Sequence, residues 1–280
     1  MTLLPGLGGR IHRLRAFGRD VLRTPDDIAQ HQREPFFWGG YVMAPWGGRI
    51  EARPTSVAGR VIDVPANFRD GTAIHGQVHS SPWDVTADGE LTTTAGGDGW
   101  PWRYSVSGAF AIVGRSLRIE QTVANLDEAA MPAGIGLHPW YRRPVVARIN
   151  ADLVFDSNLE SPAAPRSVDQ QQWDARGPDG MADDLDATWA RLDDPPVTLR
   201  WPDLGVRATM RMSSRAAYVV AASPTELDAI AVEPQTHAPQ GLRRLVNGEP
   251  GALTLVDPGG SLSLTTELTF EQIDSTKEDL

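Results

Sequence analysis

The feature that most constrains the fold of this chain is a two-residue alternation of apolar and polar side chains, broken at short intervals by glycine and proline. The alternation is clearest over residues 117–123, 206–212 and 262–270. Because every second side chain lies on the same face of a strand, these stretches predict half-buried strands of an antiparallel sheet. The 27 glycines and 22 prolines are spread evenly, which argues against long helices. The sequence therefore predicts an all-β fold with few short helices.

Turn and helix-start signals predict the remaining local structure. A short helix is expected over residues 24–32, where a proline stands at the first helical position, and another over residues 181–192. The sequence Asp-Pro-Gly-Gly between residues 252–256 and 261–270 predicts a C-terminal hairpin. The polar stretch 161–184 is expected to form a long surface loop, a kind of segment that often carries function.

The length and composition indicate one large domain. The chain has 280 residues and a mass of 30.4 kDa, within the range of a single large β-sandwich or barrel. Hydrophobic residues make up 41% and charged residues 22%, so the chain can bury a sizeable core. Since no linker or repeat divides the sequence, we expect residues 1–280 to form one domain.

The charge balance and the absence of cysteine exclude several classes of function. The formal net charge is −10, so the surface is expected to repel nucleic acids and anionic lipid headgroups. With no cysteine, the chain has no disulfide, no thiolate nucleophile and no cysteine-ligated metal. Neither a signal peptide nor an apolar run long enough to span a bilayer is visible. We therefore expect a cytoplasmic protein that binds neither nucleic acid nor membrane.

Three polar residues stand at the ends of apolar stretches and are candidates for catalysis. His75, His138 and Glu233 are each followed at once by glycine or proline. A strand that ends in this way presents its last side chain into a cleft, which is a favourable position for a catalytic group. The alternative for each residue taken alone is that it satisfies a local turn.

A metal site is not expected at the histidine pair His75 and His79. A spacing of four brings two ligands together on a helix, but Gly76 and the sequence Ser-Ser-Pro after His79 argue against one. The glycines at 6, 8 and 9 lack the strand and the Lys-Ser/Thr of a phosphate loop, and no serine-nucleophile motif is present. We expect neither a metal nor a cofactor.

The chain has nine tryptophans, and several stand close in sequence to polar candidates. Trp140 follows His138 by two residues, and Trp189 follows Asp186 by three. Indole faces stack on the apolar faces of sugar rings, while neighbouring polar groups bind the hydroxyls. This proximity favours a polyhydroxylated ligand, although packing in the core is the alternative for most tryptophans.

Four motifs, in this order, resemble those of the aldose 1-epimerase (galactose mutarotase-like) family. Residues 45–50 read Pro-Trp-Gly-Gly-Arg-Ile, and residues 74–76 read Ile-His-Gly, with a tryptophan downstream. Residues 136–141 read Gly-Leu-His-Pro-Trp-Tyr, and residues 232–236 read Val-Glu-Pro-Gln-Thr. The resemblance covers nearly the whole chain and implies a large antiparallel β-sandwich, the galactose mutarotase-like supersandwich.

The resemblance also implies a reaction and a set of site residues. The reaction is the interconversion of the α and β anomers of a free aldose such as glucose or galactose, without a cofactor. Glu233 matches the family's general base, His138 its general acid, and His75 a second histidine near the ring oxygen of the sugar. The implied substrate-binding residues are Arg49, Trp140, Asp186 and Trp189, with Asp183 and Asp184 as rivals of Asp186.

The acid role of His138 and the identity of the substrate remain open in the sequence. For His138 to be charged near neutral pH, we expect an acidic neighbourhood to raise its pKa. One alternative function is a hexose-6-phosphate 1-epimerase, with Arg142 and Arg143 near the phosphate, and another is a non-catalytic sugar-binding module. We expect the protein to be a monomer or a homodimer.

Overall fold

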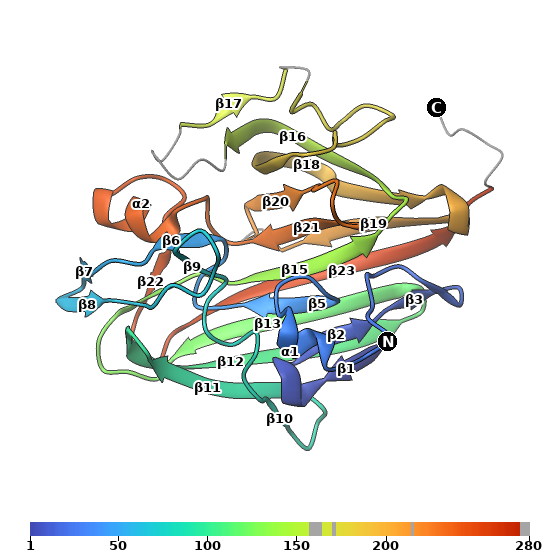
Figure 1. The fold of residues 1–280 in the computed structure, drawn as a ribbon. Coiled ribbons are helices and arrows are strands. Elements are labelled where there is room, and N and C mark those ends of the chain that lie inside the picture. The colour runs from blue at the N-terminus through green and yellow to red at the C-terminus, as the bar shows by residue number, and fades with distance from the viewer. Residues whose placement is uncertain (157–163, 170–171, 214–215, 275–280) are drawn as a thin grey trace.

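In the computed structural model, the chain folds into a large, curled antiparallel β-sheet with little helix (Figure 1). The structure describes residues 1–156, 164–169, 172–213 and 216–274. Within these ranges the main sheet has 15 strands, and its strand pairs are antiparallel. The all-β prediction is confirmed.

Most strands of the main sheet follow one continuous path, which uses both ends of the chain. From one edge to the other the order is β1 (Thr2–Leu4), β2 (Arg10–Arg13), β5 (Gly40–Met43), β15 (Gly136–Arg142), β21 (Ala229–Gln235), β20 (Tyr218–Ala222), β18 (Asp186–Trp201), β19 (Val206–Met212), β23 (Ser261–Gln272), β13 (Ser116–Asn125), β12 (Trp100–Val113), β11 (Leu91–Gly97) and β10 (Asp84–Val85). Beside this path, β16 (Val146–Asp156) pairs with β18 and with β17 (Arg166–Ser167).

Several two-stranded sheets and short helices lie outside the main sheet. The described two-stranded sheets are β3 (Arg15–Ala16) with β4 (Arg19–Asp20), β6 (Arg49–Glu51) with β9 (Thr72–Ile74), β7 (Thr55–Val57) with β8 (Arg60–Ile62), and β14 (Met131–Ala133) with β22 (Thr254–Val256). The helices of the described chain are α1 (Gln30–Arg33), α2 (Gly241–Asn247) and the 3-10 turns Pro5–Leu7 and Pro202–Leu204. The helix expected over residues 24–32 is therefore reduced to one turn that begins at Gln30.

The sheet curls so that its distant parts pack face to face. Leu117 and Ile119 on β13 belong to the same buried cluster as Leu137 and Tyr141 on β15, although several strands separate β13 from β15 in the sheet. Figure 1 shows β2 and β5 lying over β12 and β13. Burial of the apolar faces between these layers is the main stabilising contribution to such a fold.

Two local predictions are wrong. Residues 181–192 contain no helix, because β18 begins at Asp186 and lies between β16 and β20, which hydrogen-bond to its two edges. At the C-terminus the turn forms as expected, but β22 pairs with β14, and β23 pairs with β13 and β19. In both cases hydrogen bonds to strands that are distant in sequence replace the predicted local structure, a helix in the first case and a hairpin in the second.

The polar stretch 161–184 is not entirely a surface loop. Residues 161–163 and 170–171 lie outside the described part of the chain. Elsewhere in the stretch, Val168, Trp173 and Ala175 are buried in the main core cluster, and β17 pairs with β16. The backbone N–H of Ile149 donates to the carbonyl of Ala175 at 3.1 Å, which fixes this segment against the sheet.

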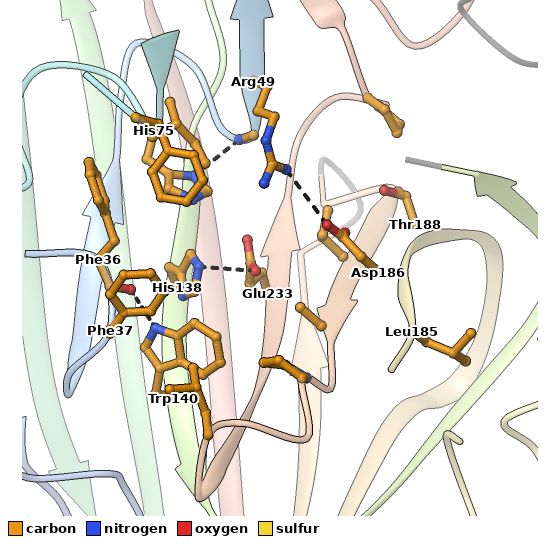
Figure 2. Close-up of a pocket in the computed structure, with 18 of the residues that line it drawn as sticks. Phe36, Phe37, Arg49, His75, His138, Trp140, Leu185, Asp186, Thr188 and Glu233 are labelled. Carbon is orange, nitrogen blue, oxygen red and sulfur yellow. Dashed lines mark hydrogen bonds and ion pairs between the residues drawn. The ribbon is translucent and has the colours of Figure 1, made fainter. Parts of the chain in front are cut away.

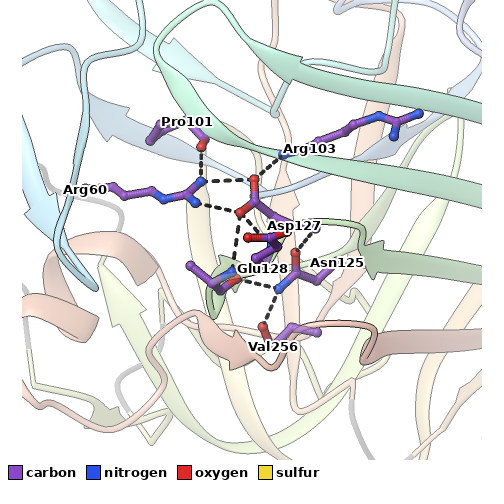
Figure 3. A network of polar contacts seen from close by, with 8 residues as sticks. Arg60, Pro101, Arg103, Asn125, Asp127, Glu128 and Val256 are labelled. Carbon is purple, nitrogen blue, oxygen red and sulfur yellow. Dashed lines mark hydrogen bonds and ion pairs between the residues drawn. The ribbon is translucent and has the colours of Figure 1, made fainter.

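A polar network joins strands that the main sheet does not connect directly (Figure 3). The Arg60 guanidinium on β8 donates to both carboxylate oxygens of Asp127, at 2.6 and 3.0 Å. The Asn125 side chain at the end of β13 accepts from the backbone N–H of Asp127 at 2.9 Å and donates to the carbonyl of Val256 at 2.9 Å. A bidentate arginine–carboxylate pair has a fixed geometry, so this network holds the β7–β8 hairpin to β13 and β22.

Candidate active site

A pocket of about 290 Å³ opens where strands β6, β9, β15, β18 and β21 meet (Figure 2). Its wall combines acidic, basic and aromatic side chains, and it collects residues that are far apart in sequence. Six of the seven residues implied by the family resemblance line it: Arg49, His75, His138, Trp140, Asp186 and Glu233.

The sheet register brings His138 and Glu233 together. Gly136 is paired with Gln235 and Trp140 with Ala231 on the antiparallel strands β15 and β21, so the same register places His138 opposite Glu233. Residues opposite each other on neighbouring strands have side chains on the same face. The His138 Nε2 and Glu233 Oε1 atoms are 3.2 Å apart, and Figure 2 shows this contact on the pocket wall.

Burial controls the protonation of His138. The side chain is 5% exposed, and its ring stacks on Tyr41 with the centroids 4.7 Å apart. Burial, helped by the positive charges of Arg10 and Arg49, lowers the pKa of His138 to about 3. The expectation that an acidic neighbourhood raises this pKa is therefore wrong, because burial disfavours the charged imidazolium and the arginine charges act in the same direction.

Burial acts in the opposite direction on Glu233. Its side chain is 4% exposed, and the loss of solvent raises the pKa of the carboxyl well above its usual range. The charge of Asp186 raises this pKa further, and the charge of Arg49 lowers it. Because burial lowers the pKa of His138 and raises that of Glu233, it favours the neutral form of both side chains, in which the pair carries one proton, on Glu233.

The backbone around His75 fixes the tautomer of its ring. His75 follows β9 in a left-handed conformation (φ +61°), and Gly76 continues it where a Cβ atom would lie 1.9 Å from the carbonyl oxygen of Ala44. The Gly48 N–H donates to Nδ1 of His75 at 3.2 Å, and burial lowers the pKa of His75 well below its usual range. The neutral ring therefore carries its proton on Nε2. The His75 and His138 rings are nearly perpendicular, with their centroids 4.8 Å apart.

Arg49 lies between two aspartates, Asp70 and Asp186. Its Nε donates to Asp70 Oδ2 at 2.8 Å, and its Nη1 lies 3.6 Å from Asp186 Oδ2. Figure 2 shows Asp186 and Arg49 facing each other across the upper part of the pocket.

The two rivals of Asp186 are engaged elsewhere. Asp183 forms an ion pair with Arg143 at 2.8 Å. Asp184 lines the pocket, but its Oδ1 accepts from both the backbone N–H and the hydroxyl of Thr225, at 3.0 and 2.8 Å. Asp186 is thus the one aspartate of the three that contacts Arg49.

The two tryptophans expected near the sugar lie in different environments. Trp140 lines the pocket, and its Nε1 donates to the carbonyl of Phe36 at 2.6 Å, which fixes the indole beside His138. Trp189 is fully buried in the core and donates to the carbonyl of Trp173 at 3.0 Å. An odd spacing along a strand puts two side chains on opposite faces, so Trp189 points away from the pocket that Asp186 faces. The expectation that Trp189 contacts the ligand is therefore wrong.

Part of the pocket wall comes from residues that were not predicted as site residues. Three phenylalanines, Phe36, Phe37 and Phe68, form an aromatic side of the pocket, and Thr188 and Gln235 add polar groups. Thr188 and Gln235 each follow a recognised site residue by two positions on the same strand, so the two-residue period could have found them. The phenylalanines come from segments before β5 and before β9, and no local pattern marked them.

The described residues contain no group of three or more histidine, aspartate or glutamate side chains placed to hold a metal ion. None of their helices is long and apolar enough to cross a membrane.

Comparison with known proteins places this pocket in a known fold. A family model described as aldose 1-epimerase matches residues 3–269. Among solved structures, a galactose mutarotase-like protein from Clostridium acetobutylicum has a TM-score of 0.78 at 18% identity, covering 97% of this chain and 92% of that one. The GalM/aldose epimerase homologue from C. elegans has a TM-score of 0.78 at 17% identity, with coverages of 97% and 95%. Galactose 1-epimerase from Lactobacillus acidophilus NCFM has a TM-score of 0.76 at 16% identity, with coverages of 97% and 91%. A search of curated proteins gave no match.

Proposed function

The chain belongs to the aldose 1-epimerase family, and we propose that it is a mutarotase, an isomerase that interconverts the α and β anomers of a free aldose. The observation that carries the proposal is the buried His138–Glu233 pair, 3.2 Å apart in a pocket with hydrogen-bonding groups on one side and aromatic rings on the other. Such a mixture of polar and aromatic groups suits a monosaccharide.

The pair has the proton content that ring opening requires. Opening removes a proton from the anomeric hydroxyl O1 and delivers one to the ring oxygen O5. Transfer of the shared proton from Glu233 to His138 gives a carboxylate that accepts the O1 proton and an imidazolium that donates to O5. Rotation about C1–C2 and closure from the other face, with the roles reversed, give the other anomer.

The neighbouring groups would orient the sugar and set this proton transfer. The Nε2–H of His75 is a donor beside His138, suited to an oxygen near the ring. Arg49 lowers the pKa of Glu233 and so favours the carboxylate form, while Asp186 accepts from a sugar hydroxyl beside it. Trp140 and the phenylalanines supply an apolar wall for a ring face.

The charges of the pocket favour a neutral aldose over a hexose 6-phosphate. The pocket wall carries two arginines, Arg49 and Arg69, against four carboxyl groups. Arg142 and Arg143 pair with Asp203 and Asp183 and do not line the pocket. A phosphate would therefore enter a region of net acidic character.

The sequence-based expectations on organisation stay predictions. A sheet that uses strands from residue 2 to residue 272 supports one domain over residues 1–280. The cytoplasmic location and the state of a monomer or homodimer stay predictions from the sequence.

The test is polarimetry of freshly dissolved α-glucose and α-galactose with the wild-type protein and with Glu233→Gln. The substitution is nearly isosteric and removes the carboxylate, so we expect a rate loss of at least ~100-fold with an unchanged thermal melt. Glu120→Gln, at an exposed position on β13, is the matched control and should keep the wild-type rate. A wild-type protein that does not accelerate mutarotation, or a Glu233→Gln variant that keeps more than about a tenth of the rate, would contradict the proposal.

A further inference from the structure

A buried histidine outside the pocket, His237, contacts the segment that carries Arg49. His237 follows the last residue of β21 by two positions, is 1% exposed and does not line the pocket. The backbone N–H of Gly47 donates to Nε2 of His237 at 2.9 Å, and this hydrogen bond is buried. It joins the end of β21, which carries Glu233, to the residues that lead into β6.

The hydrogen bonds of His237 fix its tautomer. A backbone N–H only donates, so Nε2 of His237 is unprotonated where it accepts from Gly47. The ring proton therefore lies on Nδ1, which donates to the carbonyl of Ala238 at 2.8 Å. Burial lowers the pKa of His237 to about 4, so the ring is neutral at neutral pH and Nε2 remains an acceptor.

The imidazole ring of His237 has little room to turn. A Cβ atom on Gly134 would lie 2.2 Å from Cδ2 of this ring, and a Cβ atom on Gly241 would lie 2.7 Å from Nδ1. The backbone beside the ring is also fixed, because the N–H of Ala238 donates to the carbonyl of Gly251 at 2.9 Å. Close packing and backbone pairing thus hold Nε2 in one position.

Two short links lead from Gly47 to residues of the site. The N–H of Gly48 donates to Nδ1 of His75 at 3.2 Å, and the N–H of His75 donates to the carbonyl of Gly48 at 3.0 Å. Arg49 is the first residue of β6 and is paired with Ile74 on β9. The position of Gly47 therefore affects both the donor that sets the His75 tautomer and the backbone that carries Arg49.

We propose that His237 is a positioning residue, whose Nε2 fixes Gly47 and thereby sets the tautomer of His75 and the position of Arg49. This inference rests on the proposed mutarotase function and adds a residue that acts on the site without contacting the sugar. Without this acceptor the N–H of Gly47 would be buried and unpaired, which is unfavourable enough to displace the segment. A displacement of about 1 Å at a reacting site can lower the rate about 100-fold.

Two amide variants separate the contact with Gly47 from the contact with Ala238. The side-chain oxygen of His237→Gln reaches the place of Nε2 and accepts from Gly47. His237→Asn is one methylene shorter, so its amide takes the place of Nδ1 and donates only to Ala238. Each variant keeps one hydrogen bond and loses the other, and we expect similar losses of thermal stability. In polarimetry of α-glucose and α-galactose, His237→Asn should lower kcat/KM roughly 10- to 100-fold, whereas His237→Gln should stay close to the wild type.

The ring nitrogens of His75 give a readout that does not depend on activity. Nitrogen NMR of isotope-labelled wild-type protein should show an unprotonated Nδ1 and a protonated Nε2 for His75, and the opposite arrangement for His237. In His237→Asn the two His75 signals should move toward each other, because a displaced Gly48 no longer selects one tautomer. In His237→Gln the two signals should stay at their wild-type positions.

Trp201→Phe is the matched control for a loss of stability alone. Trp201 is also a fully buried ring that donates to a backbone carbonyl, that of Arg142 at 3.0 Å, and it does not line the pocket. The substitution should lower the melting temperature and leave both kcat/KM and the His75 signals at their wild-type values.

The outcomes separate this inference from the function on which it rests. Equal losses of kcat/KM in His237→Asn and His237→Gln, a wild-type rate in His237→Asn, or unchanged His75 signals in that variant would each overturn the positioning role. A wild-type protein that does not accelerate mutarotation contradicts the proposed function instead. In that case the His75 signals still decide whether His237 holds Gly47 and the His75 tautomer in place.

Discussion

Acid should unfold this protein, because its histidines are buried in the neutral form. All six histidines are at most 8% exposed. Burial lowers the pKa of His31 to about 3 and those of His79 and His237 to about 4, against about 6.5 for an unfolded histidine. The unfolded chain therefore binds more protons below that value. The contribution to stability is complete above about pH 6.5 and is lost as the pH falls toward the folded pKa values.

The size of the effect follows from these three side chains. At pH 5 an unfolded histidine is almost fully charged, whereas these three histidines in the folded protein are almost neutral. Each of them therefore lowers the free energy of unfolding by about 2 kcal/mol between pH 7 and pH 5. The sum of about 6 kcal/mol is a large part of a typical stability of about 5–15 kcal/mol. His138 and Glu233 are left out of the sum, because burial shifts their pKa values in opposite directions and their contributions oppose each other.

The variant His79→Phe isolates one of these contributions. The His79 ring lies 4.9 Å from Phe36 and 6.0 Å from Tyr41, so an aromatic ring without a titratable group suits the site. Urea unfolding, followed by tryptophan fluorescence at pH 7, 6 and 5, gives the loss of stability within each protein, and any packing change cancels. The variant should lose about 2 kcal/mol less than the wild type between pH 7 and pH 5. An equal loss in both proteins, or a wild-type loss below about 2 kcal/mol, would refute the reasoning.

The remaining predictions concern the site and one structural network. Because burial lowers the pKa of His138 and raises that of Glu233, kcat/KM should stay nearly constant around neutral pH and fall at both extremes of pH. A value of kcat/KM that halves between pH 7 and pH 6 would contradict the interpretation that His138 and Glu233 share one proton. Asp186→Ala should raise KM by about tenfold. Because Asp186 raises the pKa of Glu233, the variant should also move the alkaline limb of the kcat/KM pH profile to lower pH. An alkaline limb at the wild-type pH would count against this coupling. Asp127→Asn should lower the melting temperature by a few degrees, because it removes the bidentate pair with Arg60. The control Asp88→Asn, at an exposed turn, should leave the melting temperature unchanged. Equal melting temperatures for the two variants would show that the network does not stabilise the fold.

Much of the strand pattern could be predicted from the sequence. The alternation over residues 117–123, 206–212 and 262–270 corresponds to β13, β19 and β23, because a side-chain period of two is a local property of the extended chain. Where tertiary partners decide the conformation, the local signal failed. Residues 181–192 resembled a helix in sequence, but the segment that begins at Asp186 forms a strand that hydrogen-bonds to β16 and β20.

The site shows the same division between local and tertiary information. His75, His138 and Glu233 could be singled out because each stands before glycine or proline after an apolar stretch, and the fold brings them to one pocket. The prediction that each ends a strand holds for His75, which follows β9, but it is wrong for His138 and Glu233, which lie inside β15 and β21. Trp189 could not be excluded, because the face it occupies depends on where β18 begins.

The sequence by itself determined the secondary-structure class, the family and the main polar candidates of the pocket, His75, His138 and Glu233, since these depend on local pattern and residue identity. The tertiary structure alone decided which strands pair, which residues form the aromatic wall, and the direction in which the pKa values of His138 and Glu233 move. The physical reason is desolvation. The net charge of −10 belongs to the whole chain, but the pKa of a buried group depends on the water that packing removes from around it.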